Sequence, residues 1–177
     1  MKVVLIVLMI FPVCFLGQIE IIESIKLDSL IYEKINDYRF KKGVSKFIAF
    51  EDSLMREFSF KLTRNNAKKE IIEHSQDNKF EFYNAECIYS YRIHCSSIER
   101  VQELKESNLD FWANSAVNAW IDSPSHEHAI SHEYYTIATI TSRIEIDANS
   151  LELFFVTSFH ALANDKSTIS GYVYHPK

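Results

Sequence analysis

Apolar residues recur at intervals of three and four along residues 20–42, the spacing that lines one face of an α-helix. The apolar positions are Ile21, Ile22, Ile25, Leu30, Ile31, Ile35 and Tyr38, and Gly43 follows as a natural helix stop. A short linker over residues 46–50 precedes a second helical pattern over residues 51–69, for which Asp52 or Ser53 is the N-cap candidate. The N-terminal part of the chain therefore predicts two amphipathic helices.

Helical spacing returns at Asn108 and continues through Trp120, where Trp112, Ala116 and Trp120 supply the apolar face. The step Ser123-Pro124 opens a further short helix, because serine is a good N-cap and proline fits the first helical position. We expect Trp112 and Trp120 to be core residues.

Three other segments have the pattern of extended chain. Residues 87–94 (CIYSYRIH) alternate as a strand does, and residues 136–146 and 151–159 are rich in β-branched and aromatic side chains. The latter two flank the turn residues DANS and predict an antiparallel hairpin, whereas residues 167–177 predict an edge strand or a tail. Helices followed by a hairpin predict an α+β domain with a small antiparallel sheet covered by helices.

Composition narrows the class of protein. The chain has 177 residues, of which 47% are apolar, so one domain with a substantial core is expected. The formal net charge is −5 and no basic stripe is visible, which argues against a nucleic acid partner.

The N-terminus, MKVVLIVLMIFPVCFLGQ, has one lysine followed by an apolar run that is short for a membrane span. This layout predicts a signal peptide over residues 1–17, export to an extracellular or periplasmic location, and a single domain over residues 18–177 without a transmembrane segment. The alternatives are a retained anchor helix and a lipid anchor at Cys14, although bulky Phe11 and Val13 precede that cysteine.

Export would leave Cys87 and Cys95 in an oxidising compartment. If residues 87–95 were extended, the two Cα atoms would lie about 26 Å apart, whereas a disulfide needs about 6 Å. The stretch contains no Gly, Pro or Asn to mark a tight turn. Both a disulfide and two free thiols remain open from the sequence.

A cluster of histidines, His126, His128 and His132, follows Trp120. His128 and His132 are four residues apart and share a helix face, whereas His126 and His128 do not, so the three do not form one ligand set on a continuous helix. The zincin pattern H-E-x-x-H is absent. We expect His128 and His132 to be surface polar residues.

An ordered series of motifs points to a known family. The series is INDYRFKKG within residues 35–62, HSQDNKFEFYNAECI at 74–88, AVNAWIDSPSHEHAISHEYYTIATI at 116–140 and LFFVTSF at 153–159. This series resembles the CAP superfamily (cysteine-rich secretory, antigen 5 and pathogenesis-related proteins, or SCP-like domains), most of all its bacterial branch, over a core of about residues 27–160. Family glycines are missing: Gly-Glu-Asn is Ala85-Glu86-Cys87 here, and Pro-Gly-His is Pro124-Ser125-His126.

The resemblance implies a three-layer α-β-α sandwich with a groove lined by His74, Glu86, His126 and Ser123, the last at a position where eukaryotic relatives carry glutamate. It also implies that His74 and His126 hold a divalent metal, often zinc, with Glu86 as an orienting partner. The simpler interpretation is that His74 and Glu86 only bond to each other and fix their loops.

Three functions follow from this site. The first is a secreted, non-catalytic binding or interaction module for a small lipid, a cell-wall component or a protein, since no activated nucleophile is evident. The second is a zinc-assisted hydrolase, peptidase-like, with zinc on the two histidines and Glu86 as the candidate catalytic base. The third is a structural envelope protein whose groove has lost its use.

Overall fold

The computed structural model describes residues 19–49, 53–74 and 85–163. The predicted signal peptide, Cys14 and the predicted C-terminal strand or tail lie outside these residues. Within the described part of the chain, no helix is both long and apolar enough to cross a membrane.

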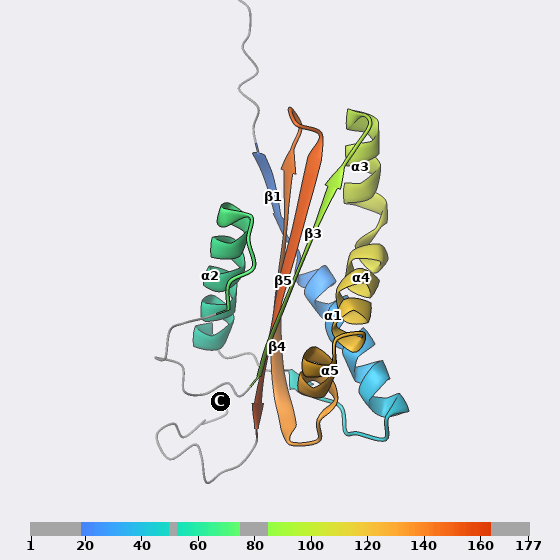
Figure 1. The fold of residues 1–177 in the computed structure, drawn as a ribbon, viewed down its shortest axis with the longest axis vertical. Helices are drawn as coiled ribbons and strands as arrows, with labels where there is room; N and C mark the ends of the chain where they lie inside the picture. Colours follow the sequence, from blue (N-terminus) through green and yellow to red (C-terminus); the bar gives the residue numbers. More distant parts are fainter. Residues whose placement is uncertain (1–18, 50–52, 75–84, 164–177) are drawn as a thin grey trace, which may run out of the picture.

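A twisted antiparallel sheet forms the middle of the molecule (Figure 1). Its strands lie in the order β1 (Ile19–Glu23), β4 (Tyr135–Asp147), β5 (Glu152–Ala163) and β3 (Ala85–His94), and the short β2 (Ile48–Ala49) pairs with β4 in parallel. The predicted hairpin is confirmed as β4 and β5, and the predicted strand over residues 87–94 is confirmed as β3. In the turn, Asp147 Oδ1 accepts a hydrogen bond of 2.9 Å from the backbone N–H of Asn149.

Helices cover both faces of this sheet (Figure 1). One face carries α2 (Ser53–Lys69), which packs on β4 and β5. The other face carries α1 (Ile25–Lys41), α4 (Leu109–Ile121) and α5 (Pro124–Ser131), with α3 (Ile98–Ser107) above them. The domain is therefore of the α+β class, as the sequence predicts.

The larger core lies between the sheet and the α1–α4 layer. Trp112 and Trp120 are both buried, as expected, and their rings pack against Phe155 and Phe159 of β5. This core is apolar because alternate residues of β5 point to this face. Burial of such large side chains is worth about 1.5–3 kcal/mol each, so this layer contributes strongly to the stability.

Two helix predictions need correction. Residues 19–23 are not helical: they form β1, and α1 begins only after Ser24, whose Oγ accepts from the Leu27 backbone N–H at 3.2 Å. The Ile-Glu-Ile-Ile-Glu segment fits the apolar spacing of a helix and the alternation of a strand. It forms a strand because its backbone pairs with β4. Helix α3 was not expected from its sequence, although Ser97 is its N-cap.

A buried arginine joins the loops at the lower end of the molecule. The guanidinium of Arg39 donates to the carbonyl oxygens of Ser45 (2.7 Å), Ile130 (3.0 Å), His132 (3.1 Å) and Tyr135 (2.8 Å). It thereby links α1 to the linker after it, to the end of α5 and to the start of β4. Burial lowers the pKa of Arg39 to about 10, which still leaves it charged at neutral pH.

Candidate functional site

The carboxylate of Glu86 lies between two histidines. Its Oε1 is 2.6 Å from Nδ1 of His74, and its Oε2 is 3.0 Å from Nε2 of His160. The Glu86 side chain is only 8% exposed and His160 is fully buried, whereas the His74 side chain is 58% exposed. The result is a His74–Glu86–His160 series that runs from the surface into the interior, which we call the His–Glu–His series.

The strand register brings the inner two members together. Glu86 of β3 is directly opposite His160 of β5, and opposite residues of antiparallel strands share one face of the sheet. That face is the one under α2, because the Phe58 ring of α2 meets the His160 ring edge-on at a centroid distance of 5.5 Å. Glu86 and His160 are therefore fixed by the sheet itself.

His74 is held in place by the chain segment that follows α2. The buried side chain of Asn66 accepts from the Glu73 backbone N–H at 3.0 Å and donates to the Glu73 carbonyl at 3.1 Å. An ion pair between Lys69 and Glu73 supports the same segment. Because both backbone groups of Glu73 are fixed, the adjoining His74 is positioned against Glu86.

The backbone at His126 approaches β3 from the opposite face. Neighbouring residues of a strand point to opposite faces, so Cys87 points away from the His–Glu–His series. The Cys87 Sγ lies 3.9 Å from the His126 carbonyl oxygen, which places the start of α5 on that other face. The His126 side chain is half-buried, and burial, followed by the charge of His74, holds its pKa below the usual value.

The remaining predicted residues lie along α5. Ser123 occupies the N-cap position and Pro124 the first helical position, as predicted, but the Ser123 side chain makes no capping bond and its Oγ lies 3.5 Å from Ser125 Oγ. His128 and His132 are both exposed, as expected, and their ring centroids are 4.5 Å apart.

The described residues do not suit a catalytic zinc ion. Such a site needs three protein ligands and one open position. Among the residues that the structure describes, no group of three His, Cys, Asp or Glu side chains is placed to hold a metal. Both oxygens of Glu86 are bonded to imidazole nitrogens. A metal on His74 and His126 stays a prediction, and we derive no reaction step from it.

The cysteine question left open by the sequence has a direct answer in the structure. Cys87 and Cys95 are free, and β3 runs extended through Cys87 to His94. The continuous strand keeps the two sulfur atoms far apart. Burial, followed by the charge of Glu86, raises the pKa of the Cys87 thiol, which keeps it protonated and unreactive.

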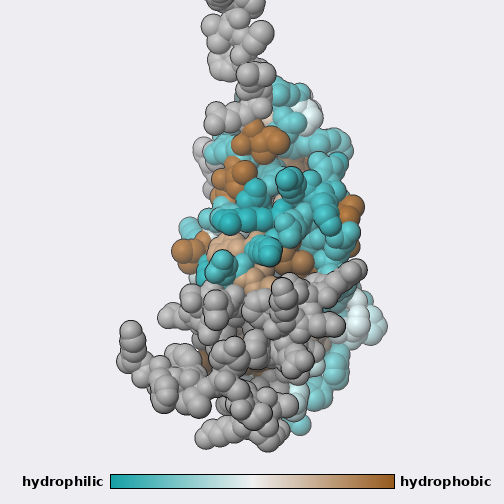
Figure 2. Space-filling view, turned by 90° about the vertical axis from the view of Figure 1, so that its left-hand side faces the viewer, coloured by the Kyte–Doolittle hydropathy of each residue, from teal (hydrophilic) through white to brown (hydrophobic). Residues whose placement is uncertain are grey.

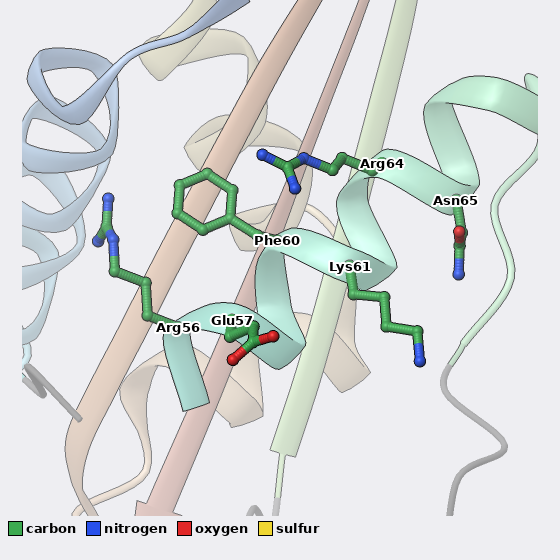
Figure 3. A pocket seen from close by; sticks show the side chains of 6 residues that line it. All are labelled: Arg56, Glu57, Phe60, Lys61, Arg64 and Asn65. Carbon is green, nitrogen blue, oxygen red and sulfur yellow. The ribbon is translucent and has the colours of Figure 1, made fainter. Parts of the chain in front are cut away.

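An open hollow of about 470 Å³ lies on the outer side of α2, and it contains none of the predicted site residues. Its lining consists of Arg56, Glu57, Phe60, Lys61, Arg64 and Asn65. Figure 3 shows Phe60 between Arg56 and Arg64, with Lys61 pointing away from that side of the helix.

Both arginines of the hollow are engaged in the fold. The guanidinium carbons of Arg56 and Arg64 lie 5.0 Å and 5.6 Å from the centre of the Phe60 ring. Arg56 pairs with Asp28 of α1 at 2.9 Å, and Arg64 pairs with Glu23 of β1 at 2.7 Å. These contacts attach α2 to the rest of the domain, so the hollow has a structural explanation.

Among the described residues on the face that carries α2, most are hydrophilic (Figure 2). The apolar residues Ile19 and Ile21 of β1 are 54% and 50% exposed. They are two apart on one strand and project to the same side, and a pair of exposed apolar side chains is still normal on a protein surface.

His160 is the member of the series that sequence reasoning missed. His160 directly follows the strand predicted over residues 151–159, and the structure extends β5 to Ala163. Nothing local signals that its partner is Glu86, 74 residues earlier. Only the β3–β5 register supplies that information. No family model, curated protein or solved structure matches this chain.

Proposed function

We propose that this chain is a secreted, non-catalytic binding or interaction module of the CAP or SCP-like type. The observation that carries the proposal is that the nearly buried Glu86 carboxylate holds, at 2.6 Å, the 58% exposed ring of His74, and both residues belong to the motif HSQDNKFEFYNAECI on which the family resemblance rests. In this proposal the exposed His74 ring is the part of the site that a ligand meets, and Glu86 fixes its orientation.

The opening motif INDYRFKKG gives further support. Asn36 Oδ1 accepts from the Phe47 backbone N–H at 2.7 Å, and Arg39 joins four carbonyl groups, so two polar residues of the motif hold the loops below the sheet. Gly43 has a φ of +76°, a conformation that favours glycine. Each of these residues therefore has a physical reason to stand at its position in the motif.

The arrangement of layers supports the same proposal. With α2 on one face and α1, α4 and α5 on the other, the sheet has helical cover on both sides, which is what a three-layer α-β-α sandwich of the CAP type requires. The proposed site then lies at the β3 end of the sheet. Its ligand class in this proposal is a lipid, a cell-wall component or a protein surface.

The hydrolase alternative has no geometry in its favour, because the described residues do not bring three metal ligands together. A buried carboxylate bonded to two imidazoles is well suited to orient a histidine and poorly placed to activate a water molecule.

A binding screen with matched variants tests the proposal. Purified protein is titrated with sterols, fatty acids and peptidoglycan fragments, and saturable binding is expected for at least one class. His74→Ala is expected to weaken that binding at least about tenfold. The matched control is His94→Ala, since His94 also lies on β3 and also pairs with a glutamate, Glu152, at 2.9 Å.

Two results contradict the proposal. The first is the absence of saturable binding to all three ligand classes by a folded wild-type protein. The second is equal binding by the His74→Ala and wild-type proteins, which would favour a structural envelope protein instead.

A further inference from the structure

The two faces of the sheet differ in polarity, and α2 covers the more polar one (Figure 1). Along β4 and β5, the residues that point to α1 and α4 are mostly apolar and buried, among them Ile140, Ile144, Phe155 and Phe159. The residues that point to α2 include the buried polar side chains of Thr139, Thr141, Ser158 and His160. The strand register places Thr139 opposite His160 and Thr141 opposite Ser158. A polar surface of the sheet therefore lies buried under α2.

Helix α2 meets this polar surface with hydroxyl groups of its own. Ser59 Oγ lies 2.6 Å from Thr141 Oγ1. Thr63 Oγ1 lies 2.9 Å from Thr141 Oγ1 and 2.8 Å from Ser158 Oγ. The apolar cluster beside these hydroxyls is small, and its buried members are Ala67, Ile88, Phe154 and Val156. Because water replaces the hydroxyl–hydroxyl hydrogen bonds when α2 leaves the sheet, this contact holds α2 less firmly than an apolar contact of the same area.

Exposed ion pairs hold the rim of α2. Arg64 of α2 pairs with Glu23 of β1, and its side chain is 56% exposed. Glu70, the residue after α2, pairs with Arg92 of β3, and the Glu70 side chain is 57% exposed. Ion pairs with such exposure contribute little to stability and are screened by salt. The rim contacts therefore do not compensate for the polar inner contact.

The His–Glu–His series crosses the boundary between α2 and the sheet. His74 is positioned through Asn66 of α2, which binds both backbone groups of the preceding residue. Glu86 and His160 stand on β3 and β5. Movement of α2 away from the sheet removes the support that holds His74 against Glu86. The series is therefore complete only while α2 is docked on the sheet.

We propose that α2 is a detachable cover of the sheet, which leaves and returns as a unit while the sheet and the α1–α4 layer stay folded. The docked state contains the complete His–Glu–His series. In the undocked state Glu86 and His160 face solvent, and His74 has lost the support of Asn66. This inference does not depend on the proposed function, because it uses the contacts of α2 and no ligand.

Thiol labelling of two cysteine variants tests the inference. Ser158 and Ser142 are both fully buried, but Ser158 lies under α2, whereas Ser142 follows Thr141 in β4 and points to the opposite face. Ser158→Cys is expected to react with iodoacetamide under native conditions at least about tenfold faster than the matched control Ser142→Cys, because departure of α2 uncovers only the former. Peptide mass spectrometry locates the modified cysteine, and circular dichroism establishes that both variants are folded.

Hydrogen exchange of the wild-type protein gives a second measurement without a substitution, and it decides the question if a cysteine variant does not fold. Amides of α2 are expected to exchange at least about tenfold faster than those of α4. Added salt is expected to speed the exchange of α2 and not that of α4. Arg64→Gln is expected to speed the exchange of α2. The matched control Arg100→Gln, which removes an exposed ion pair with Glu103 inside α3, is expected to leave it unchanged.

Three results overturn the inference. Equal labelling rates of Ser158→Cys and Ser142→Cys would show that α2 opens only when the whole domain unfolds. Equal protection of the α2 and α4 amides would show the same. Exchange of α2 that responds neither to salt nor to Arg64→Gln would show that the rim ion pairs do not control its docking.

Discussion

Nε2 of His160 lies 3.0 Å from Oε2 of Glu86, and both side chains are almost completely withdrawn from solvent. The family resemblance implies that Glu86 lines a groove. The structure places Glu86 at the second position of β3, with one carboxylate oxygen against the buried His160 and the other against the exposed His74. The site residue that the sequence did not reveal is thus the one that holds Glu86 from within the fold.

The buried partner is expected to matter more for stability than the exposed one. His160→Phe retains the ring volume but leaves one oxygen of a buried carboxylate without its imidazole, so a loss of about 1–3 kcal/mol is expected. Urea unfolding of the variant measures this loss. His94→Ala removes an exposed His–Glu pair from the same strand and is expected to change the stability by less than about 0.5 kcal/mol. Equal effects of the two variants would contradict this account.

Arg39 is expected to be among the most sensitive residues of the domain. Arg39→Met keeps much of the packing against Phe47, over whose ring the guanidinium carbon lies at 3.7 Å. It removes the guanidinium donor from four buried or partly buried carbonyl groups, of which that of His132 still accepts from the Tyr135 N–H. A destabilisation of at least about 3 kcal/mol is expected, because acceptors left without a donor away from water are costly.

Thermal and urea unfolding measure the effect, with Arg39→Lys as the comparison. Lysine keeps the charge but lacks the planar fork that reaches several acceptors, so an intermediate loss is expected. A methionine variant as stable as the wild type would show that water replaces the arginine.

Asp28 is expected to make the protein less stable as the pH rises through weakly acidic values. This residue of α1 is 6% exposed, and burial raises its pKa from 3.8 to about 6, against the opposing effects of hydrogen bonds with Ser142 and of the Arg56 charge. Between these two values the folded state keeps a proton that the unfolded chain has lost. This contribution is fully present below pH 3.8 and is lost as the pH rises to about 6.

The loss is at most about 3 kcal/mol. Unfolding free energies of the wild type and of Asp28→Asn, measured across this pH range, test the expectation. The asparagine variant cannot ionise at this position, so its stability is expected to fall less steeply with pH. Parallel curves for the two proteins would show that Asp28 titrates normally.

The two described cysteines are expected to differ in reactivity. Cys87 is fully buried and its thiol pKa is raised by burial, whereas Cys95 is only partly buried. Brief treatment of the native protein with iodoacetamide is expected to modify Cys95 first, and Cys87 only after denaturation. Peptide mass spectrometry identifies the modified residue. A cross-linked peptide containing both cysteines would contradict the free thiols.

Several features of the fold could be predicted because they depend on local patterns. The β4–β5 hairpin follows from two apolar segments around DANS, and α4 follows from tryptophan and alanine residues at helical spacing. The start of α5 follows from Ser123-Pro124. In each case the signal and the structure lie within the same short segment.

The residues 19–23 show where such reasoning ends. Their isoleucines suit a helix or a strand. The segment becomes a strand because it pairs with the edge of β4, more than a hundred residues later in the chain. The candidate site likewise depends on contacts between segments that are far apart in the sequence. His74 could be singled out from its motif, but Asn66, which fixes the neighbouring backbone, gave no signal in a helical segment.

The sequence alone determined the α+β class, the hairpin and the buried tryptophans. It also named His74 and Glu86 as candidate site residues. The tertiary structure decided that β1 is a strand, that His160 completes the series behind Glu86, and that the start of α5 lies against Cys87 on the other face of β3. The physical reason is that helix spacing and turn chemistry act over a few residues, whereas strand register and the choice of face are set by contacts between distant segments.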